Sequence, residues 1–246
     1  MATIILLPGM DGSGSLFEDF IASLPSGVEA MVVKYPPDRA LDYAELEALA
    51  RAALPIQGSF LLVGESFSGP VAVALAASSP VGLRGLVLVC SFVRSPIALP
   101  RVLHPLISLL PVWLVPIRIA AAVLLGRFQT AALCARLESV MATVRPAVWR
   151  ARLRAVLSAD VAGRLSNVKV PVLYLRAEND RVVPRSAFEL IAHLLPKVSL
   201  VELEGPHFLL QAKPVESAAQ VGAFAREVGF AFSHFAPERT RARARP

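Results

Sequence analysis

One serine of this chain stands where a serine can act as a nucleophile. Ser66 lies in the window 64–69 (GESFSG), directly after an apolar run and directly before a stretch of small residues. A sharp turn from strand to helix strains the backbone of such a serine and lifts its hydroxyl above the edge of a sheet. The positions two before and two after it must be small, and Gly64 and Ser68 are. The same window also fits a plain turn, so the prediction depends on partners elsewhere in the chain.

A serine hydroxyl is a weak nucleophile that needs a base, and the base needs an orienting group. One histidine, His207, follows a predicted strand, whereas the other three lie in a proline-broken run, inside a helix and near the tail: His104, His193 and His234. The acid candidate, Asp180, follows the predicted strand at 171–176. Ser66, Asp180 and His207 thus all come just beyond the carboxyl end of a strand, where open α/β sheets place their sites.

Two other carboxylates compete with Asp180 for the acid role. Asp11 lies in a glycine-rich turn, where aspartate commonly bonds its own backbone. Glu178 comes two residues before Asp180, and we expect it to be solvated or paired with a cation. We therefore predict Asp180 as the acid.

The elements that must position these residues alternate along the chain. Six apolar, β-rich runs predict strands, at residues 3–7, 31–35, 60–63, 85–90, 171–176 and 198–203. Asp42, with Glu45 three residues later, forms a capping-box pattern that predicts a helix from residue 42 to 54. Strands that are apolar on both faces and separated by single helices indicate a parallel sheet covered on both sides.

After the fourth predicted strand the alternation stops, and the sequence fits helices interrupted by prolines rather than strands. This predicts a helical cap inserted between the fourth and fifth strands. We expect one discontinuous core domain made of residues 1–92 and 166–236, with residues 93–165 as the cap. Residues 237–246 are arginine-rich and lack large apolar side chains, so we expect a basic disordered tail.

Charge is divided unevenly between these parts. From Arg94 to Arg154 nine arginines accompany one acid, Glu138, which gives +8, and residues 238–246 add +3. Because the whole chain carries +6, the rest carries −5. The basic cap has three readings: a solvated face, attraction to an anionic membrane surface or an acidic acyl carrier protein, and nucleic-acid binding. We reject nucleic acid, because no recognition motif is present and no aromatic residues interleave with the arginines.

Composition bounds the class of protein. With 246 residues, 55% of them hydrophobic and 18% charged, the chain can build a core and is not disordered. Cys90 and Cys134 form neither a disulfide framework nor a zinc-ligand pattern. The uncharged run at 102–117 holds 16 residues, and as a helix it would span about 24 Å, less than the roughly 30 Å of a bilayer core. The amino terminus has no signal-peptide pattern, so we expect a cytoplasmic protein.

Four segments taken together resemble the α/β-hydrolase superfamily. They are LPGMDGSG at 7–14, GESFSG at 64–69, ENDRVVP at 178–184 and GPH at 205–207, in the order that the family has them. Within the superfamily the chain most resembles small bacterial carboxylesterases related to the enzyme that removes the methyl ester from pimeloyl-acyl carrier protein. The resemblance implies an α/β-hydrolase fold: a mostly parallel sheet of about six strands, helices on both faces and a helical cap after the fourth strand.

The resemblance also assigns roles to residues. Ser66 would be the nucleophile, His207 the base and then the acid, and Asp180 the group that orients His207. The resemblance matches residues 8–10 to the His-Gly-X loop of the family, so the backbone N–H groups of Met10 and Phe67 would form the oxyanion hole.

The cap contains no motif that assigns its residues. Trp113 and Trp149, with the leucine-rich run from Leu103 to Leu125, could line an acyl pocket or could equally form the cap's own core. Both interpretations stay open.

The function that these features predict is hydrolysis of carboxylic esters of short to medium acyl chains through an acyl-enzyme intermediate. The substrate would be a small ester, and no metal or organic cofactor is implied. The alternatives are thioesterase, lactonase or carbon–carbon hydrolase chemistry on the same triad, a hydrolase fold that binds a ligand without turnover, and a membrane-associated lipase. The sequence does not predict an oligomeric state.

Overall fold

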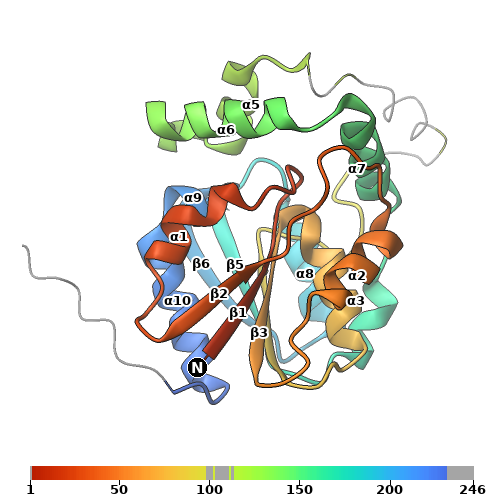
Figure 1. The fold of residues 1–246 in the computed structure, drawn as a ribbon, viewed down its shortest axis with the longest axis vertical. Helices are drawn as coiled ribbons and strands as arrows, with labels where there is room; N and C mark the ends of the chain where they lie inside the picture. Colours follow the sequence, from red (N-terminus) through yellow and green to blue (C-terminus); the bar gives the residue numbers. More distant parts are fainter. Residues whose placement is uncertain (1, 98–101, 103–110, 112–113, 232–246) are drawn as a thin grey trace, which may run out of the picture.

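A parallel sheet of six strands forms the centre of the molecule, in the spatial order β2-β1-β3-β4-β5-β6 (Figure 1). The computed structural model describes residues 2–97, 102, 111 and 114–231. The strands are β1 Ala2–Leu7, β2 Val28–Val32, β3 Phe60–Glu65, β4 Leu83–Val89, β5 Val172–Asn179 and β6 Ser199–Pro206. The predicted architecture of six parallel strands is therefore confirmed.

The second strand lies three residues earlier than the sequence predicted. Val28 already pairs with Ala2 of β1, and the ladder ends at Val32. Beyond it the chain stays extended, but Val33 donates a single N–H to Leu6 and Tyr35 donates one to the turn after β1. The apolar run at 31–35 was misleading because Val33 and Tyr35 are buried in the core without continuing the sheet.

Helices cover both faces of the sheet (Figure 1). One face carries α1 Glu18–Ala22, α9 Leu209–Ala212 and α10 Pro214–Glu227, and the other carries α2 Tyr43–Ala52, α3 Gly69–Ala77 and α8 Arg185–Leu194. The capping box that opens α2 is confirmed, because the Asp42 carboxylate accepts the Glu45 N–H at 2.9 Å and the Glu45 carboxylate accepts the Asp42 N–H at 2.9 Å.

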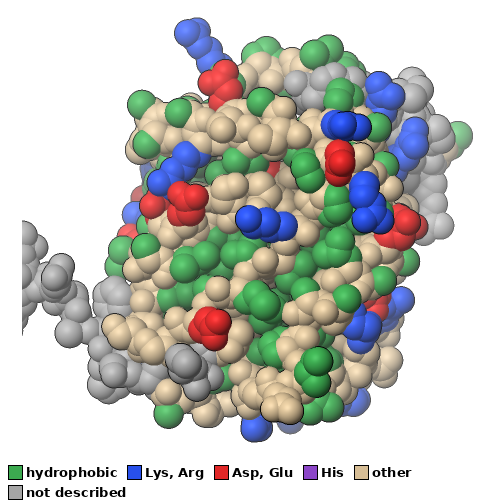
Figure 2. All heavy atoms as spheres, in the orientation of Figure 1, with side chains coloured by type: hydrophobic (Ala, Val, Ile, Leu, Met, Phe, Trp, Pro, Cys, Tyr) green, Lys and Arg blue, Asp and Glu red, His purple; other side chains and the backbone are tan. Residues whose placement is uncertain are grey.

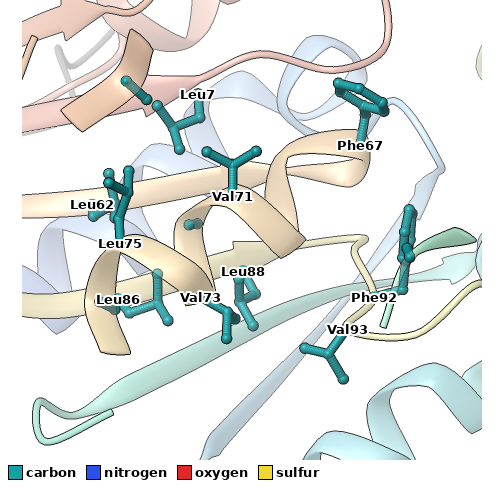
Figure 3. Packing of buried hydrophobic residues seen from close by; sticks show 14 of the residues in the cluster. Leu7, Leu62, Phe67, Val71, Val73, Leu75, Leu86, Leu88, Phe92 and Val93 are labelled. Carbon is teal, nitrogen blue, oxygen red and sulfur yellow. The ribbon is translucent and has the colours of Figure 1, made fainter. Parts of the chain in front are cut away.

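Helix α3 is apolar around most of its circumference because it is buried between the sheet and its neighbours. Its small residues allow the axis to lie close to β3 and β4. Figure 3 shows the contact, with Leu62 of β3 beside Leu75, and Leu86 and Leu88 of β4 beside Val73. This packing holds the turn between β3 and α3, where Ser66 lies, against a rigid support.

Between β4 and β5 the chain forms helices that lie across the carboxyl end of the sheet, as predicted for a cap (Figure 1). The described ones are α5 Ile117–Leu124, α6 Ala131–Thr143 and α7 Pro146–Ser158, with 3₁₀ turns at Gly126–Phe128 and Ala162–Asn167. The chain enters and leaves this insertion side by side, because Arg94 and Asp160 form an antiparallel bridge.

The domain boundaries stay predictions, and the tail at 237–246 lies outside the described residues. The carboxyl half of α7 contributes Ala155 and Val156 to the same core cluster as α3, so the cap is continuous with the body there. Among the residues that the structure describes, no helix is both long and apolar enough to cross a membrane.

Candidate active site

Ser66 sits at the turn from β3 to α3 with a positive φ of 47°, in the left-handed region that non-glycine residues rarely occupy. A short 3₁₀ segment, Ser66–Ser68, carries the chain from the strand into the helix. A Cβ atom on Gly64 would lie 2.6 Å from the Cβ of Ala72, so the predicted need for a small residue before the serine is confirmed. The turn holds the Ser66 hydroxyl out above the carboxyl end of the sheet.

The structure brings together the three side chains that the sequence predicted for the triad. The Ser66 Oγ atom lies 2.8 Å from His207 Nε2, and His207 Nδ1 lies 2.9 Å from Asp180 Oδ2 and 3.0 Å from Oδ1. A carboxylate only accepts hydrogen bonds, so Nδ1 carries a proton and Nε2 of the neutral ring accepts from Ser66. The side chains of His207 and Asp180 are 3% and 2% exposed. The geometry suits proton transfer from Ser66 to His207.

Asp180 is held as a carboxylate by its surroundings. Burial opposes ionisation, but the hydrogen bond and charge of His207 and the N–H groups of Val183 and Val182 outweigh it, so the pKa of Asp180 is lowered. Those two N–H groups donate to Oδ1 at 2.9 and 2.8 Å. The rival carboxylates lie elsewhere: Asp11 accepts the N–H and hydroxyl of Ser13, as expected for a turn, and Glu178 is exposed.

Ser68, the other hydroxyl of the GESFSG window, is fully buried. It donates to the carbonyl of Pro8 and accepts from the Tyr35 hydroxyl, with the two hydroxyl oxygens 2.8 Å apart. The Tyr43 hydroxyl donates to the Phe67 carbonyl at 2.9 Å. These bonds hold the turn after β3, which carries Ser66, against the turn after β1, which carries Pro8.

The Met10 backbone, predicted as an oxyanion donor, lies in the turn after β1. We call residues 8–12 the oxyanion loop. Among the hydrogen bonds of the described residues, the Met10 N–H has no partner, so it is available to a ligand. The loop closes on itself through a bond from the Gly12 N–H to the Gly9 carbonyl at 3.1 Å. The roles of Met10 and Phe67 as donors remain proposals.

Two charged residues at the oxyanion loop were missed by the sequence analysis. Glu65, the last residue of β3, accepts the amide of Gln211 at 3.0 Å, and its carboxyl lies against Gly9 of the oxyanion loop. Burial raises the pKa of Glu65 to about 8. Arg152 of α7 donates to the carbonyls of Met10 and Asp11 at 2.8 and 2.7 Å. The available signal for Glu65 was a charge at the end of an otherwise apolar strand, whereas Arg152 resembles its neighbouring arginines.

The two tryptophans predicted as substrate-binding differ in what the structure describes. Trp149 is buried in a small cluster with Val144 and Val148, and Met10 and Met141 pack against this cluster, so it joins the oxyanion loop to the cap core. Its Nε1 atom is buried without a hydrogen-bond partner. Trp113 lies outside the described residues.

Cys90, Asp180 and His207 offer ligand atoms within 4.8 Å of one another, which is close enough to hold a metal ion. Asp180 and His207 are already bonded to each other. Burial, and then the negative charge of Asp180, raise the pKa of Cys90 well above its usual value, which keeps the thiol protonated. A metal needs the thiolate, so the group suits proton handling better than metal binding.

Residues 4–221 match the family model described as the alpha/beta hydrolase family. No curated protein sequence matches the chain. A bromoperoxidase from Bacillus anthracis superposes with a TM-score of 0.80 at 14% identity, over 92% of each chain. An esterase from Exiguobacterium antarcticum superposes with 0.78 at 14% identity, also over 92% of each chain. An esterase from Rhodococcus sp. ECU1013 superposes with 0.72 at 23% identity, over 93% of this chain and 91% of that one. At these identities the likeness is one of fold.

Proposed function

The chain belongs to the alpha/beta hydrolase family and has its fold, and on that premise we propose that it is a serine hydrolase acting on carboxylic esters. The observation that carries the proposal is the continuous chain of hydrogen bonds from Ser66 through His207 to Asp180, with distances of 2.8 and 2.9 Å. Such a chain activates a hydroxyl that is otherwise a weak nucleophile.

In the proposed reaction the Ser66 oxygen attacks the ester carbonyl while His207 Nε2 takes its proton. Asp180 holds the ring by its Nδ1–H and stabilises the positive charge that forms on it. The carbonyl oxygen becomes an oxyanion, which the N–H groups of Met10 and Phe67 would bind. His207 then returns the proton to the leaving alcohol, and water cleaves the acyl-enzyme by the reverse sequence.

For the substrate we propose an ester with a short to medium acyl chain. Trp149 supports this, because it places an apolar surface beside Met10 at the oxyanion loop. Two of the three solved structures named above are described as esterases and one as a bromoperoxidase, so the fold alone does not select among reactions. Membership of the pimeloyl-acyl carrier protein methyl ester esterase group also stays a proposal.

Labelling with a fluorophosphonate tests the nucleophile. We expect the wild type to be labelled and Ser66→Ala to be unreactive. Ser68→Ala is the matched comparison, because it removes a neighbouring buried hydroxyl that holds the Pro8 carbonyl of the oxyanion loop, so we expect labelling of this variant to be slower but not lost. Labelling of Ser66→Ala at the wild-type rate contradicts the proposal.

A panel of nitrophenyl esters, acyl thioesters and lactones then distinguishes ester hydrolysis from the alternatives. Labelling of Ser66 without turnover of any of these substrates would indicate a ligand-binding protein.

An acidic carrier or membrane surface remains part of the proposal because of the basic cap. Arg94, Arg127 and Arg136 pair on the surface with Asp160, Glu204 and Asp19, so part of the cap's charge is balanced by acidic side chains. Among the described residues, three exposed cap arginines have no ion pair: Arg118, Arg145 and Arg154. If they attract an acidic partner, kcat/KM for a substrate on that partner should fall steeply as salt rises, and a flat response argues against it.

A further inference from the structure

We propose that Arg152, on cap helix α7, is a positioning residue that sets the oxyanion loop in the conformation that binds the transition state. This inference rests on the proposed function, because it assigns a task in the reaction that Ser66 would carry out. It makes part of the cap a component of the catalytic apparatus rather than only a cover over it.

Three backbone carbonyls surround the Arg152 guanidinium. Nη1 donates to the Met10 and Asp11 carbonyls at 2.8 and 2.7 Å, and Nη2 donates to the Pro36 carbonyl at 3.0 Å. The residue is only 2% exposed, although it lies on a helix rich in arginine. One cap side chain therefore joins the oxyanion loop to the segment that follows β2.

These contacts fix the backbone conformation at Met10, the residue whose N–H would bind the oxyanion. Two successive carbonyls, those of Met10 and Asp11, are held by one nitrogen, so the peptide units on the carboxyl side of Met10 have little freedom to rotate. On the amino side, the Gly9 carbonyl accepts the Gly12 N–H at 3.1 Å, and the Glu65 carboxyl lies against Gly9. The Met10 N–H lies between these anchors and has no partner among the described hydrogen bonds, so its direction is fixed in advance of the reaction.

The loop is shaped around the guanidinium itself. Gly12 has a φ of +74°, and a Cβ atom there would lie 2.7 Å from Nη2 and 2.9 Å from Cζ of Arg152. A planar group with five donors can bond carbonyls in different directions at once, whereas a lysine ammonium is a compact point charge. The site is thus fitted to arginine in both shape and hydrogen bonding.

The charge of Arg152 adds to the effect of position. The described ion pairs do not include Arg152, but the negative charge of the nearby Asp11 carboxylate, which is bonded to Ser13, acts on the guanidinium and balances part of its charge. Burial lowers the pKa of Arg152, yet a guanidinium remains protonated in proteins. The part of this buried positive charge that Asp11 does not balance favours the negative charge that develops at the neighbouring oxyanion hole.

Steady-state kinetics of Arg152→Met and Arg152→Lys with a nitrophenyl ester test the proposal, with the rate of Ser66 phosphonylation as a second readout. We expect Arg152→Met to lower kcat and the phosphonylation rate by about 10- to 100-fold with KM within about twofold, because the oxyanion forms only in the transition state. Arg152→Lys should recover part of the loss. Arg164→Met is the matched control, since Arg164 is an exposed arginine of the same insertion that pairs with Glu47 instead of the oxyanion loop, and it should behave as wild type.

Two results overturn the proposal. One is an unchanged kcat and phosphonylation rate in a folded Arg152→Met whose melting temperature falls, because Arg152 would then only attach the cap. The other is a loss confined to KM, which would indicate substrate binding. If Arg152→Met does not fold, Arg152→Lys decides: we expect at least a threefold lower kcat, and wild-type kcat refutes the role. Failure of the proposed function is distinct, because the wild type itself would then not be labelled at Ser66.

Discussion

Two parts of the cap, helix α7 and the pair α5–α6, lie over the same edge of the sheet but are attached to the body by different kinds of contact (Figure 1). Helix α7 buries Val148, Trp149 and Arg152, and Arg152 bonds backbone carbonyls of the body. The pair α5–α6 reaches the body through surface ion pairs, Arg136 with Asp19 at 2.6 Å and Arg127 with Glu204. Figure 2 shows acidic and basic side chains next to one another along this border.

The pair α5–α6 also contacts the loops that carry the triad. Arg181, next to Asp180, donates to the Ala122 carbonyl at 3.0 Å, and the N–H of Phe208, next to His207, donates to the Leu124 carbonyl at 3.1 Å. Hydrogen bonds that involve a buried charge contribute more than exposed ion pairs, which contribute about 0–1 kcal/mol. Helix α7 is thus held to the body by a buried charge, whereas the ion pairs of α5–α6 are exposed and its apolar contact with the body is through Phe208.

The largest effect that we predict is a loss of catalytic rate that leaves the contacts of both α7 and α5–α6 with the body unchanged. Asp180→Asn leaves the cap contacts in place but removes the carboxylate that orients His207, so kcat should fall by about 10⁴-fold. Ester turnover measures it, with circular dichroism as the control for folding. A loss of less than about tenfold would mean that another group orients His207.

Removing the buried attachment should have the largest effect on stability. In Arg152→Met three carbonyls lose a charged donor, and we expect the free energy of unfolding to fall by about 3–5 kcal/mol. Urea unfolding measures it. A change below about 1 kcal/mol would mean that α7 is attached to the body no more strongly than α5–α6 is.

Glu65, which belongs to the body and lies against the oxyanion loop, should make the free energy of unfolding depend on pH. Burial raises the pKa of Glu65 from its ordinary 4.5 to about 8 in the folded state, so the folded state binds the proton more tightly than the unfolded chain does. Stability from this group is therefore present at low pH and lost as pH rises through 8, by about 3 kcal/mol between pH 5 and 8. Glu65→Gln cannot titrate, so comparing urea unfolding of the two proteins across this range isolates the effect. If the free energy of unfolding changes with pH in the same way in both proteins, the predicted effect of Glu65 is wrong.

The smallest effect concerns the exposed attachment. Arg136→Gln should lower the free energy of unfolding by less than about 1 kcal/mol, because both partners face solvent and salt screens them. A double-mutant cycle with Asp19→Asn measures the coupling. A coupling above about 2 kcal/mol would show that α5–α6 is held as firmly as α7.

The sheet and the meeting of Ser66, Asp180 and His207 could be predicted because each follows a strand, and the carboxyl ends of parallel strands share one edge. The position of β2 could not, since buried Val33 and Tyr35 have the same apolar pattern whether or not they pair. The place of Trp149 beside Met10 depends on how the cap docks, and periodicity carries no information on docking.

Local chemistry along the chain determined which residues can act: a serine in a tight turn, and a histidine and an aspartate after strands. Folding in three dimensions decided what supports them. Arg150, Arg152 and Arg154 are alike in sequence, yet only the packing of α7 buries the middle one against the oxyanion loop. The physical reason is that the burial of a charge depends on what lies across from it, and here that is a loop 141 residues away in the chain.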